Sequence, residues 1–181
     1  QKITKTSHPL FGHTTSETDP NGITTKYTYD VFGRKLSIIE HDGNWTTSDY
    51  RLCGFGLNCP PNAYHLIYTQ SSDAPPEIKY YDNFNREIQE EKIGFNGLKI
   101  FKDVYYDSKG QVSKKSEPYY QSESPLFTYY GYDYVGRNTS IIYPNNSRDS
   151  MYYNGYTTVY VNGLGQKKTV IKNAKDQLVR V

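Results

Sequence analysis

Residues 27–34 read YTYDVFGR, and this pattern returns, more or less degraded, along the whole chain. The best second copy, YGYDYVGR at residues 130–137, repeats it almost letter for letter. The other copies read YYDNFNR at 80–86, YYDSKGQ at 105–111, YVNGLGQ at 160–166, KNAKDQ at 172–177 and, as the tail of a first copy, PLFGH at 9–13. A pattern that recurs in this way indicates a chain built from one repeated structural unit.

The unit, called the YD unit below, predicts a strand, a tight turn and a return strand. Aromatic and β-branched residues before the Asp suit a pleated, half-buried strand. The Asp or Asn side chain caps the backbone two residues on, and the Gly three residues later supplies a positive φ. Asn85 replaces that Gly, because Asn tolerates the left-handed region next best. The Arg or Gln that follows begins the return strand. The motif residues are Tyr27, Tyr29, Asp30, Gly33, Arg34, Tyr81, Asp82, Asn85, Arg86, Tyr106, Asp107, Gly110, Tyr132, Asp133, Gly136, Arg137, Asn162 and Gly165.

The spacing of the copies is regular. Their successive left-handed positions are 21, 52, 25, 26 and 29 residues apart, counted over Gly12, Gly33, Asn85, Gly110, Gly136 and Gly165. Turns of a second kind lie between them, such as DPNG at 19–22 and HDGN at 41–44. Two alternating turn types predict an all-β fold: an antiparallel meander of β-hairpins that forms a curved or spiral sheet, with the YD turns along one edge.

The 52-residue interval indicates one period plus an insertion. We therefore expect first repeats at 1–44, a loop-rich insertion at 45–76 and further repeats at 77–181. The insertion contains the only Trp and both Cys, with a plausible strand at 64–69. Because the sequence does not begin with Met and a repeat is already in progress at Leu10, we expect a fragment of a much longer protein.

Composition limits the fold and the partners. Of the 181 residues, 20 are Tyr and 35% are hydrophobic, which is little material for a closed, dry core, so the sheet should have at least one wet face. The best helix former, Ala, occurs only at positions 63, 74 and 174, so long helices are not expected. The net charge of +2 is mild and interspersed, which does not indicate a nucleic-acid partner. No apolar run of about 18 residues predicts a membrane span.

The repeated Tyr, Asp and Arg residues allow a structural and a functional interpretation. Tyr residues at fixed positions are favoured as cross-strand packing, and sugar stacking on exposed Tyr faces is the alternative. The Asp and Arg of each copy are favoured as a turn cap with a solvated or cross-strand partner over a catalytic acid or an anion clamp.

Motifs for catalysis or cofactor binding are not evident. The four His residues are scattered without metal-ligand spacing, and the two Cys lack C-x-x-C spacing. Neither a G-x-S-x-G nucleophile elbow nor a G-x-x-x-x-G-K-[ST] phosphate loop occurs. We therefore expect no enzyme, no metal site and no cofactor. In an exported protein Cys53 and Cys59 can form a disulfide that pins the insertion; reduced thiols remain the alternative.

Units of the form Y-x-Y-D-x-x-G-R at this period resemble the YD repeats of the Rhs family, found in bacterial polymorphic toxins, in the B and C components of insecticidal toxin complexes and in animal teneurins. The resemblance covers essentially the whole chain. It is most specific at residues 27–34 and 130–137. The insertion is also similar to a segment of bacterial Rhs-type proteins, in which a Trp precedes Cys53-Gly54 and Cys59-Pro60.

The resemblance implies a long antiparallel sheet wound as a spiral strip into a hollow shell. In bacterial members the shell encloses a toxic C-terminal segment, and in several an aspartyl self-cleavage site releases it. The D-P-x-G-L-x-G landmark of that site is absent here, so the resemblance implies shell wall and neither protease nor toxin.

Our leading hypothesis is therefore a non-enzymatic shell segment of an exported, secreted or cell-surface protein. Its expected partners are neighbouring YD repeats and, through the parent protein, a toxin cargo or toxin-complex component. The isolated segment could also self-associate through open sheet edges. The second hypothesis is a carbohydrate- or cell-surface-binding module that uses exposed Tyr side chains. An enzyme is the third hypothesis and has only generic Asp, His and Ser residues in its favour.

Overall fold

The computed structural model describes residues 2–54 and 56–181, and every regular element in this part of the chain is a β-strand. The chain divides into two compact units, Gln1–Phe101 and Lys102–Val181. The first contains β1 (Thr4–Ser7), β2 (Thr14–Thr18), β3 (Thr24–Tyr29), β4 (Lys35–Ile39), β5 (Trp45–Leu52), β6 (His65–Ser71), β7 (Glu77–Tyr81) and β8 (Glu87–Ile93). From β9 (Lys99–Tyr106), which crosses the boundary, the second continues with β10 (Val112–Ser116), β11 (Tyr119–Tyr120), β12 (Phe127–Tyr132), β13 (Asn138–Ile142), β14 (Arg148–Asn154), β15 (Thr157–Val161), β16 (Lys167–Lys172) and β17 (Leu178–Arg180). The all-β class expected from the sequence is confirmed.

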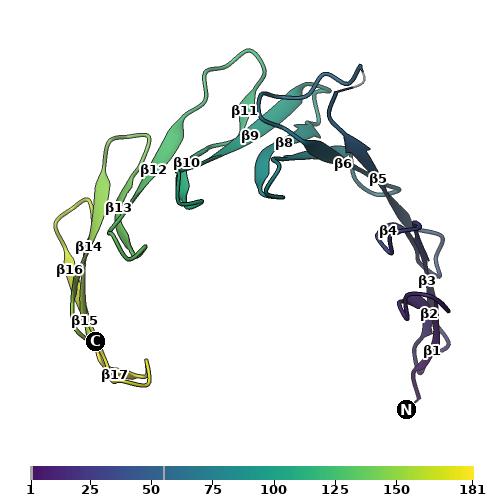
Figure 1. The fold of residues 1–181 in the computed structure, drawn as a ribbon, viewed down its shortest axis with the longest axis horizontal. Helices are drawn as coiled ribbons and strands as arrows, with labels where there is room; N and C mark the ends of the chain where they lie inside the picture. Colours follow the sequence, from purple (N-terminus) through teal and green to yellow (C-terminus); the bar gives the residue numbers. More distant parts are fainter. Residues whose placement is uncertain (1, 55) are drawn as a thin grey trace. The chain divides into compact units, whose positions relative to one another are not determined.

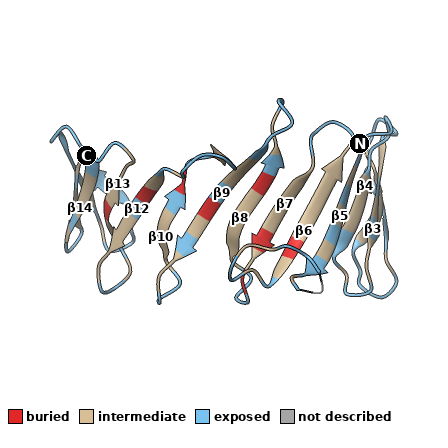
Figure 2. Ribbon diagram, turned by 90° about the horizontal axis from the view of Figure 1, so that it is seen from above, coloured by how far each residue is buried: buried red, intermediate tan, exposed pale blue. Residues whose placement is uncertain are grey.

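In the first unit, β1 to β8 form a ladder in which each strand pairs antiparallel with the next one in the sequence (Figures 1 and 2). The turn at 30–33 joins β3 to β4, and the turn at 82–85 joins β7 to β8. Both turns lie at the same edge of the sheet, meaning the side at which the strands end, because an even number of strands separates them. The long loop at 53–64 joins β5 to β6 at this edge as well, so it occupies the place of a YD turn.

In the second unit one YD turn lies at the opposite edge of the sheet from the other YD turns. The turns at 107–110, 133–136 and 173–176 share one edge, since β10 pairs directly with β12 and the later strands pair in chain order. A loop of only two residues, Gly155 and Tyr156, joins β14 to β15, as the pairing of Asn154 with Thr157 shows. This extra hairpin moves the next copy, at 162–165, to the opposite edge. The expectation that every YD turn shares one edge is therefore wrong for the copy with Asn162 and Gly165.

A β-bulge follows every YD turn of the described residues except the turn at 162–165, where β15 and β16 pair in regular register. In the hairpin of β3 and β4, Thr28 faces Ser37 while Tyr29 faces Lys35, so that Leu36 is the extra residue. The register shifts in the same way in the hairpins β1–β2, β7–β8, β9–β10, β12–β13 and β16–β17. A bulge increases local twist and leaves the extra residue outside the regular ladder. The repeated bulge therefore creates backbone groups that need partners elsewhere.

The described residues of both units form sheets with a thin core. Only two hydrophobic residues are nearly inaccessible, Leu66 and Tyr80, at 6% and 5% exposure. Buried polar residues outnumber them: Asp82, Glu91, Asp103, Ser116, Thr128 and Ser140. Figure 2 shows the buried positions as isolated bands on single strands. Stability therefore depends on ladder hydrogen bonds and cross-strand pairs, in which each hairpin supports its neighbours.

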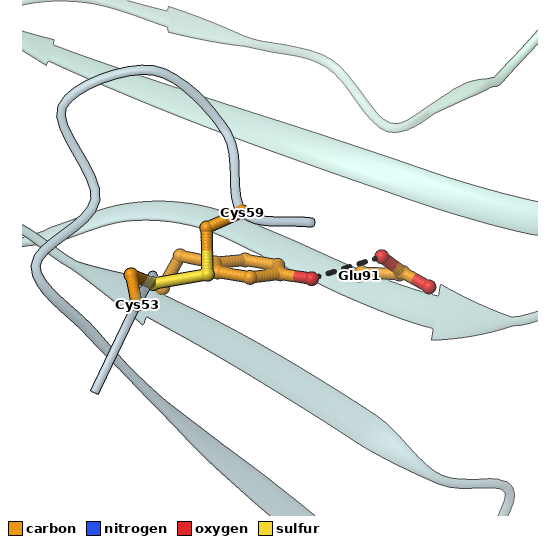
Figure 3. The surroundings of a disulfide bond; sticks show 4 residues. Cys53, Cys59 and Glu91 are labelled. Carbon is orange, nitrogen blue, oxygen red and sulfur yellow. Dashed lines mark hydrogen bonds between the residues drawn. A yellow bond between two sulfur atoms is a disulfide. The ribbon is translucent and has the colours of Figure 1, made fainter. Parts of the chain in front are cut away.

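The insertion covers the best-buried part of the first unit. Cys53 and Cys59 form a disulfide near Glu91 on β8 (Figure 3). The dashed line in that view marks the 3.4 Å hydrogen bond from the Tyr80 hydroxyl to Glu91 Oε2. Burial, the charge of Glu91 and this bond together raise the pKa of Tyr80 to about 12. The Tyr64 N–H then donates to the Tyr81 carbonyl at 2.7 Å, which ties the end of the loop to β7.

Replacement of Gly110 tests the left-handed turn position. Its φ is +80°, a conformation in which a residue with a Cβ is strained. We expect Gly110→Ala to lower the free energy of unfolding by about 1–2 kcal/mol. Gly110→Asn should cost less than Gly110→Ala, because Asn85 and Asn146 adopt the same conformation in this chain. Urea unfolding of the three proteins measures the difference; equal effects of Ala and Asn would contradict this account.

Candidate functional site

The repeated feature of the molecule is the turn that contains Asp30. The Asp30 N–H donates to the Arg34 carbonyl at 2.9 Å, and the Gly33 N–H donates to the Asp30 carbonyl at 3.0 Å. Asp30 Oδ1 accepts hydrogen bonds from the N–H groups of Phe32 and Arg34, both at 2.9 Å. Asp30 Oδ2 accepts one from Arg34 Nε at 2.6 Å. One carboxylate thus fixes the turn, the start of the return strand and the direction of the arginine.

The other YD turns repeat this geometry. Asp133 binds the N–H groups of Val135 and Arg137 and the Arg137 Nε, the last at 2.7 Å. Asp82 binds the corresponding groups and also the Arg86 Nη2, at 2.6 Å. The same backbone contacts are made by the side chains of Asp107, Asn162 and Asn173.

Where the Asp is replaced by Asn, the Arg is replaced by Gln, and the pair is preserved in neutral form. Asn162 Nδ2 donates to Gln166 Oε1 at 2.7 Å, and Asn173 Nδ2 donates to Gln177 Oε1 at 2.8 Å. Asp107 is the mixed case. Its partner position holds Gln111, whose Nε2 instead donates to the Gly136 carbonyl of the next YD turn at 2.9 Å.

A tyrosine hydroxyl binds the backbone carbonyl at the bulge. Tyr29, Tyr132 and Tyr153 donate to the carbonyls of Thr14, Val112 and Asn138, at 2.8, 2.9 and 2.7 Å. Tyr50 donates to Lys35 at 3.4 Å. Each acceptor stands two residues after the left-handed position of the preceding copy, so the contact always joins one repeat to the next.

The same tyrosine ring also supports the residue that follows the left-handed position. The Arg34 guanidinium lies 4.4 Å from the Tyr50 ring centre, and the Arg137 guanidinium lies 4.3 Å from that of Tyr153. His13 takes this position in the first copy and stacks on Tyr29 at 5.1 Å. The cation–π contact and the hydroxyl bond together connect successive hairpins through one side chain.

The electrostatics of the turns favour ionised aspartates. Burial raises the pKa of Asp82, but hydrogen bonds from Arg86 and from the Phe84 N–H lower it more, so that the net pKa lies below the ordinary value. The pKa values of Asp30 and Asp133 are lowered in the same way by Arg34 and Arg137. An acid with a lowered pKa is a poor proton donor at neutral pH, so these groups suit a structural role.

The motif residues meet within each repeat and its neighbour, and they do not converge on one catalytic centre. Tyr27 lies apart from the Asp–Arg pair, with Lys35 Nζ 4.8 Å from its ring centre. Among the described residues, no group of three or more His, Cys, Asp or Glu side chains is placed to hold a metal ion. Helices that are long and apolar enough to cross a membrane are likewise not found in that part of the chain.

Comparison with known proteins identifies the repeat. Residues 10–44, which include the turn of Asp30, match the family model described as the RHS repeat. This part of the chain contains an RHS repeat. No curated protein matches this chain over its sequence.

Two solved structures share the fold of this chain. One is TcdB2–TccC3 without its hypervariable C-terminal region, with a TM-score of 0.61, and the other is TcdB2–TccC3–TEV, with a TM-score of 0.63. Both are 10% identical to this chain over 98% of its length. The chain spans 16% of the length of each. At this identity the comparison shows the open, antiparallel YD-repeat fold.

Two features of the Rhs repeat were missed by the sequence analysis. The first is the bulge carbonyl that receives the tyrosine hydroxyl, because a backbone acceptor leaves no mark on the sequence. The second is Asp149, which accepts hydrogen bonds from the Gly163 N–H at 3.0 Å and the Tyr143 hydroxyl at 2.9 Å. Asp149 thereby anchors the displaced turn at 162–165. A single aspartate in a strand carried no signal that could have shown this.

Removal of one tyrosine hydroxyl tests the contact between repeats. We expect Tyr153→Phe to lower the free energy of unfolding by about 1 kcal/mol, because the carbonyl of Asn138 loses its donor. Tyr152→Phe is the matched control: this neighbour is 61% exposed, and its change should stay within about 0.5 kcal/mol. Urea denaturation of both variants provides the comparison, and equal losses would show that the hydroxyl bond contributes nothing specific.

Conversion of one charged pair into the neutral pair found elsewhere tests the turn. Arg86→Gln should cost about 1–3 kcal/mol, since the nearly buried Asp82 carboxylate loses a charged donor. The double variant Asp82→Asn/Arg86→Gln should cost at least about 0.5 kcal/mol less than the sum of the single variants, because Asn and Gln can pair as Asn162 and Gln166 do. Strict additivity in a double-mutant cycle would contradict this.

The same variants give a pH test. Because the folded-state pKa of Asp82 is lowered, its contribution to stability is present above the ordinary Asp pKa and is lost as pH falls through the folded value. We therefore expect the double variant to lose less stability than the wild type on acidification below about pH 4. Thermal unfolding midpoints between neutral and acidic pH measure this difference.

Proposed function

We propose that this chain is a non-catalytic wall segment of a longer Rhs protein, whose sheet forms part of a shell around a cargo. The observation that carries the proposal is the contact between neighbouring repeats that a tyrosine hydroxyl and a bulge carbonyl make at four places. Such contacts make an extended strip that grows by addition of hairpins. The fold shared with TcdB2–TccC3 supports the same interpretation, since this chain matches 16% of each of those longer chains over 98% of its own length.

The proposed partners are further YD repeats of the same parent protein. In the part of the chain that is described, β1 pairs only with β2, and β17 pairs only with β16. Each therefore offers one unpaired backbone edge to another strand. In the parent protein we propose that neighbouring repeats occupy these edges; in isolation, the same edges would favour self-association.

We also propose that the protein is exported, with a toxic segment as the cargo. The disulfide between Cys53 and Cys59 supports an oxidising compartment, where such bonds persist. The cargo rests on the resemblance to bacterial Rhs toxins. The lowered pKa values of the turn aspartates support a non-enzymatic role.

Protease protection in the parent protein tests the encapsulating role. Ile38 lies in β4, which is paired on both sides, so Ile38→Pro removes a ladder hydrogen bond and should open the wall. We expect the C-terminal segment of the parent protein to resist added protease in the wild type and to be degraded several-fold faster in this variant.

Val31→Pro is the matched control. Val31 is 81% exposed at the first inner position of its turn, where the turn at 19–22 already has Pro20. Type I turns accept Pro at this position, so protection should remain. A C-terminal segment that is digested equally fast in all three proteins would refute encapsulation.

A further inference from the structure

A groove of about 610 Å³ opens in the first unit beside the insertion. It lies at the edge of the YD turns, between the turn of Asp30 and that of Asp82. Its lining includes the rings of Phe32, Tyr50, Tyr64 and His65. A volume of this size falls within the range of small-ligand sites, which are mostly apolar with a few placed polar groups.

The insertion creates this groove. The loop at 53–64 occupies the place of a YD turn, and its end contributes Tyr64 to the same groove that Phe32 lines. Both rings face solvent to a large extent, with Phe32 at 77% and Tyr64 at 56% exposure. Aromatic residues also protrude from other turns, such as Phe84 and Tyr134, but Phe32 and Tyr64 line one common groove.

Arg34 is the fixed cation of the groove. Its Nε is bound to Asp30 at 2.6 Å, and its guanidinium lies 4.4 Å from the Tyr50 ring centre and 5.2 Å from that of Phe32. In the part of the chain that the structure describes, its two terminal amino groups have no hydrogen-bond partner. The side chain is held in place while one side of the guanidinium fork remains open for a bidentate anion.

The charges around the groove favour an anion. Among described residues, the lining contains Arg34, Arg51 and His65 but no carboxylate. Asp49 binds the Nε and Nη2 of Arg51, which leaves Arg34 as the better donor. Burial and the charge of Arg34 lower the pKa of His65, so the histidine is neutral at physiological pH and does not compete for the anion as a second cation.

We propose that this groove binds a carboxylate-bearing saccharide, with the carboxylate on the terminal amino groups of Arg34. Pyranose rings present C–H faces that pack on aromatic rings, and Phe32 and Tyr64 both line the groove, where such contacts can be made. This ligand site does not depend on the proposed shell function. The saccharide would bind at the surface of the wall.

The surrounding backbone argues against an extended acidic peptide as the ligand. Peptides commonly bind by adding a strand to an open sheet edge. The strands beside the groove, β4, β5 and β6, are each paired on both sides, so they offer no open backbone row. A compact ligand with one anionic group therefore fits better.

Isothermal titration of the purified 181-residue chain tests the proposal. The probes are glucuronic acid and N-acetylneuraminic acid, with glucose and N-acetylglucosamine as neutral sugars, acetate as a bare anion and a triglutamate peptide as an acidic peptide. We expect at least one acidic sugar to bind at least tenfold more tightly than the neutral sugars, acetate and the peptide.

Arg34→Gln and Arg137→Gln form the matched pair of variants. Both arginines have the same Asp bond and tyrosine contact, at 2.6 and 4.4 Å for Arg34 and 2.7 and 4.3 Å for Arg137, but only Arg34 lines the groove. Binding should fall at least tenfold in Arg34→Gln and stay within twofold of the wild type in Arg137→Gln. Circular dichroism checks that both variants remain folded.

Tyr64→Ala and Tyr156→Ala form a second pair, because both rings are similarly exposed, at 56% and 63%, and only Tyr64 lines the groove. We expect at least a fivefold loss for Tyr64→Ala and no change for Tyr156→Ala. The proposal would be overturned by equal binding of neutral and acidic sugars, by tighter binding of acetate or the peptide, by equal losses in the two arginine variants, or by no detectable binding of any acidic sugar.

Discussion

The hydrogen bond between a tyrosine hydroxyl and the carbonyl at a β-bulge is the contact on which the rest of the structure depends. Each YD turn is closed locally by its aspartate or asparagine, and a bulge follows all of these turns except the one at 162–165. The bulge removes a carbonyl from the regular ladder, and a buried carbonyl without a donor is costly. At four of these bulges the donor comes from the next repeat, so these hairpins depend on a neighbour.

This dependence explains how a chain with so few buried hydrophobic residues can form an ordered sheet. The tyrosine contributes a donor to the backbone, a ring surface to the preceding arginine or histidine, and area to the sheet face. These contacts are short in range and repeat along the chain. Stability is therefore distributed over many similar junctions, as in other repeat proteins. The disulfide and the insertion that covers Tyr80 add one local region of greater burial.

Most of the local structure could be predicted from the sequence, because the YD unit specifies its own turn. Asp30 and Gly33 identify the cap and the left-handed residue, and Asn85 follows the same rule with a φ of 62°. The contacts between repeats could not be predicted. Their acceptors are backbone groups, and their partners are up to 20 residues away, as for Tyr132 and Val112. The groove near Arg34 could not be predicted either, because it depends on how the insertion folds over the edge at which the YD turns lie.

The two-residue loop between β14 and β15 shows that spacing and strand count are separate properties of this repeat. Between Gly136 and Gly165 the chain contains three strands. Between Gly110 and Gly136 only two full strands lie in the meander. The two intervals nevertheless differ little in length, at 29 and 26 residues. An odd count reverses the direction in which the motif points, and an even count preserves it. A single short loop is thus enough to change the edge of the sheet at which a copy of the motif lies. Whether the number of strands between two copies is odd or even, and not the number of residues, decides at which edge of the sheet a given turn lies.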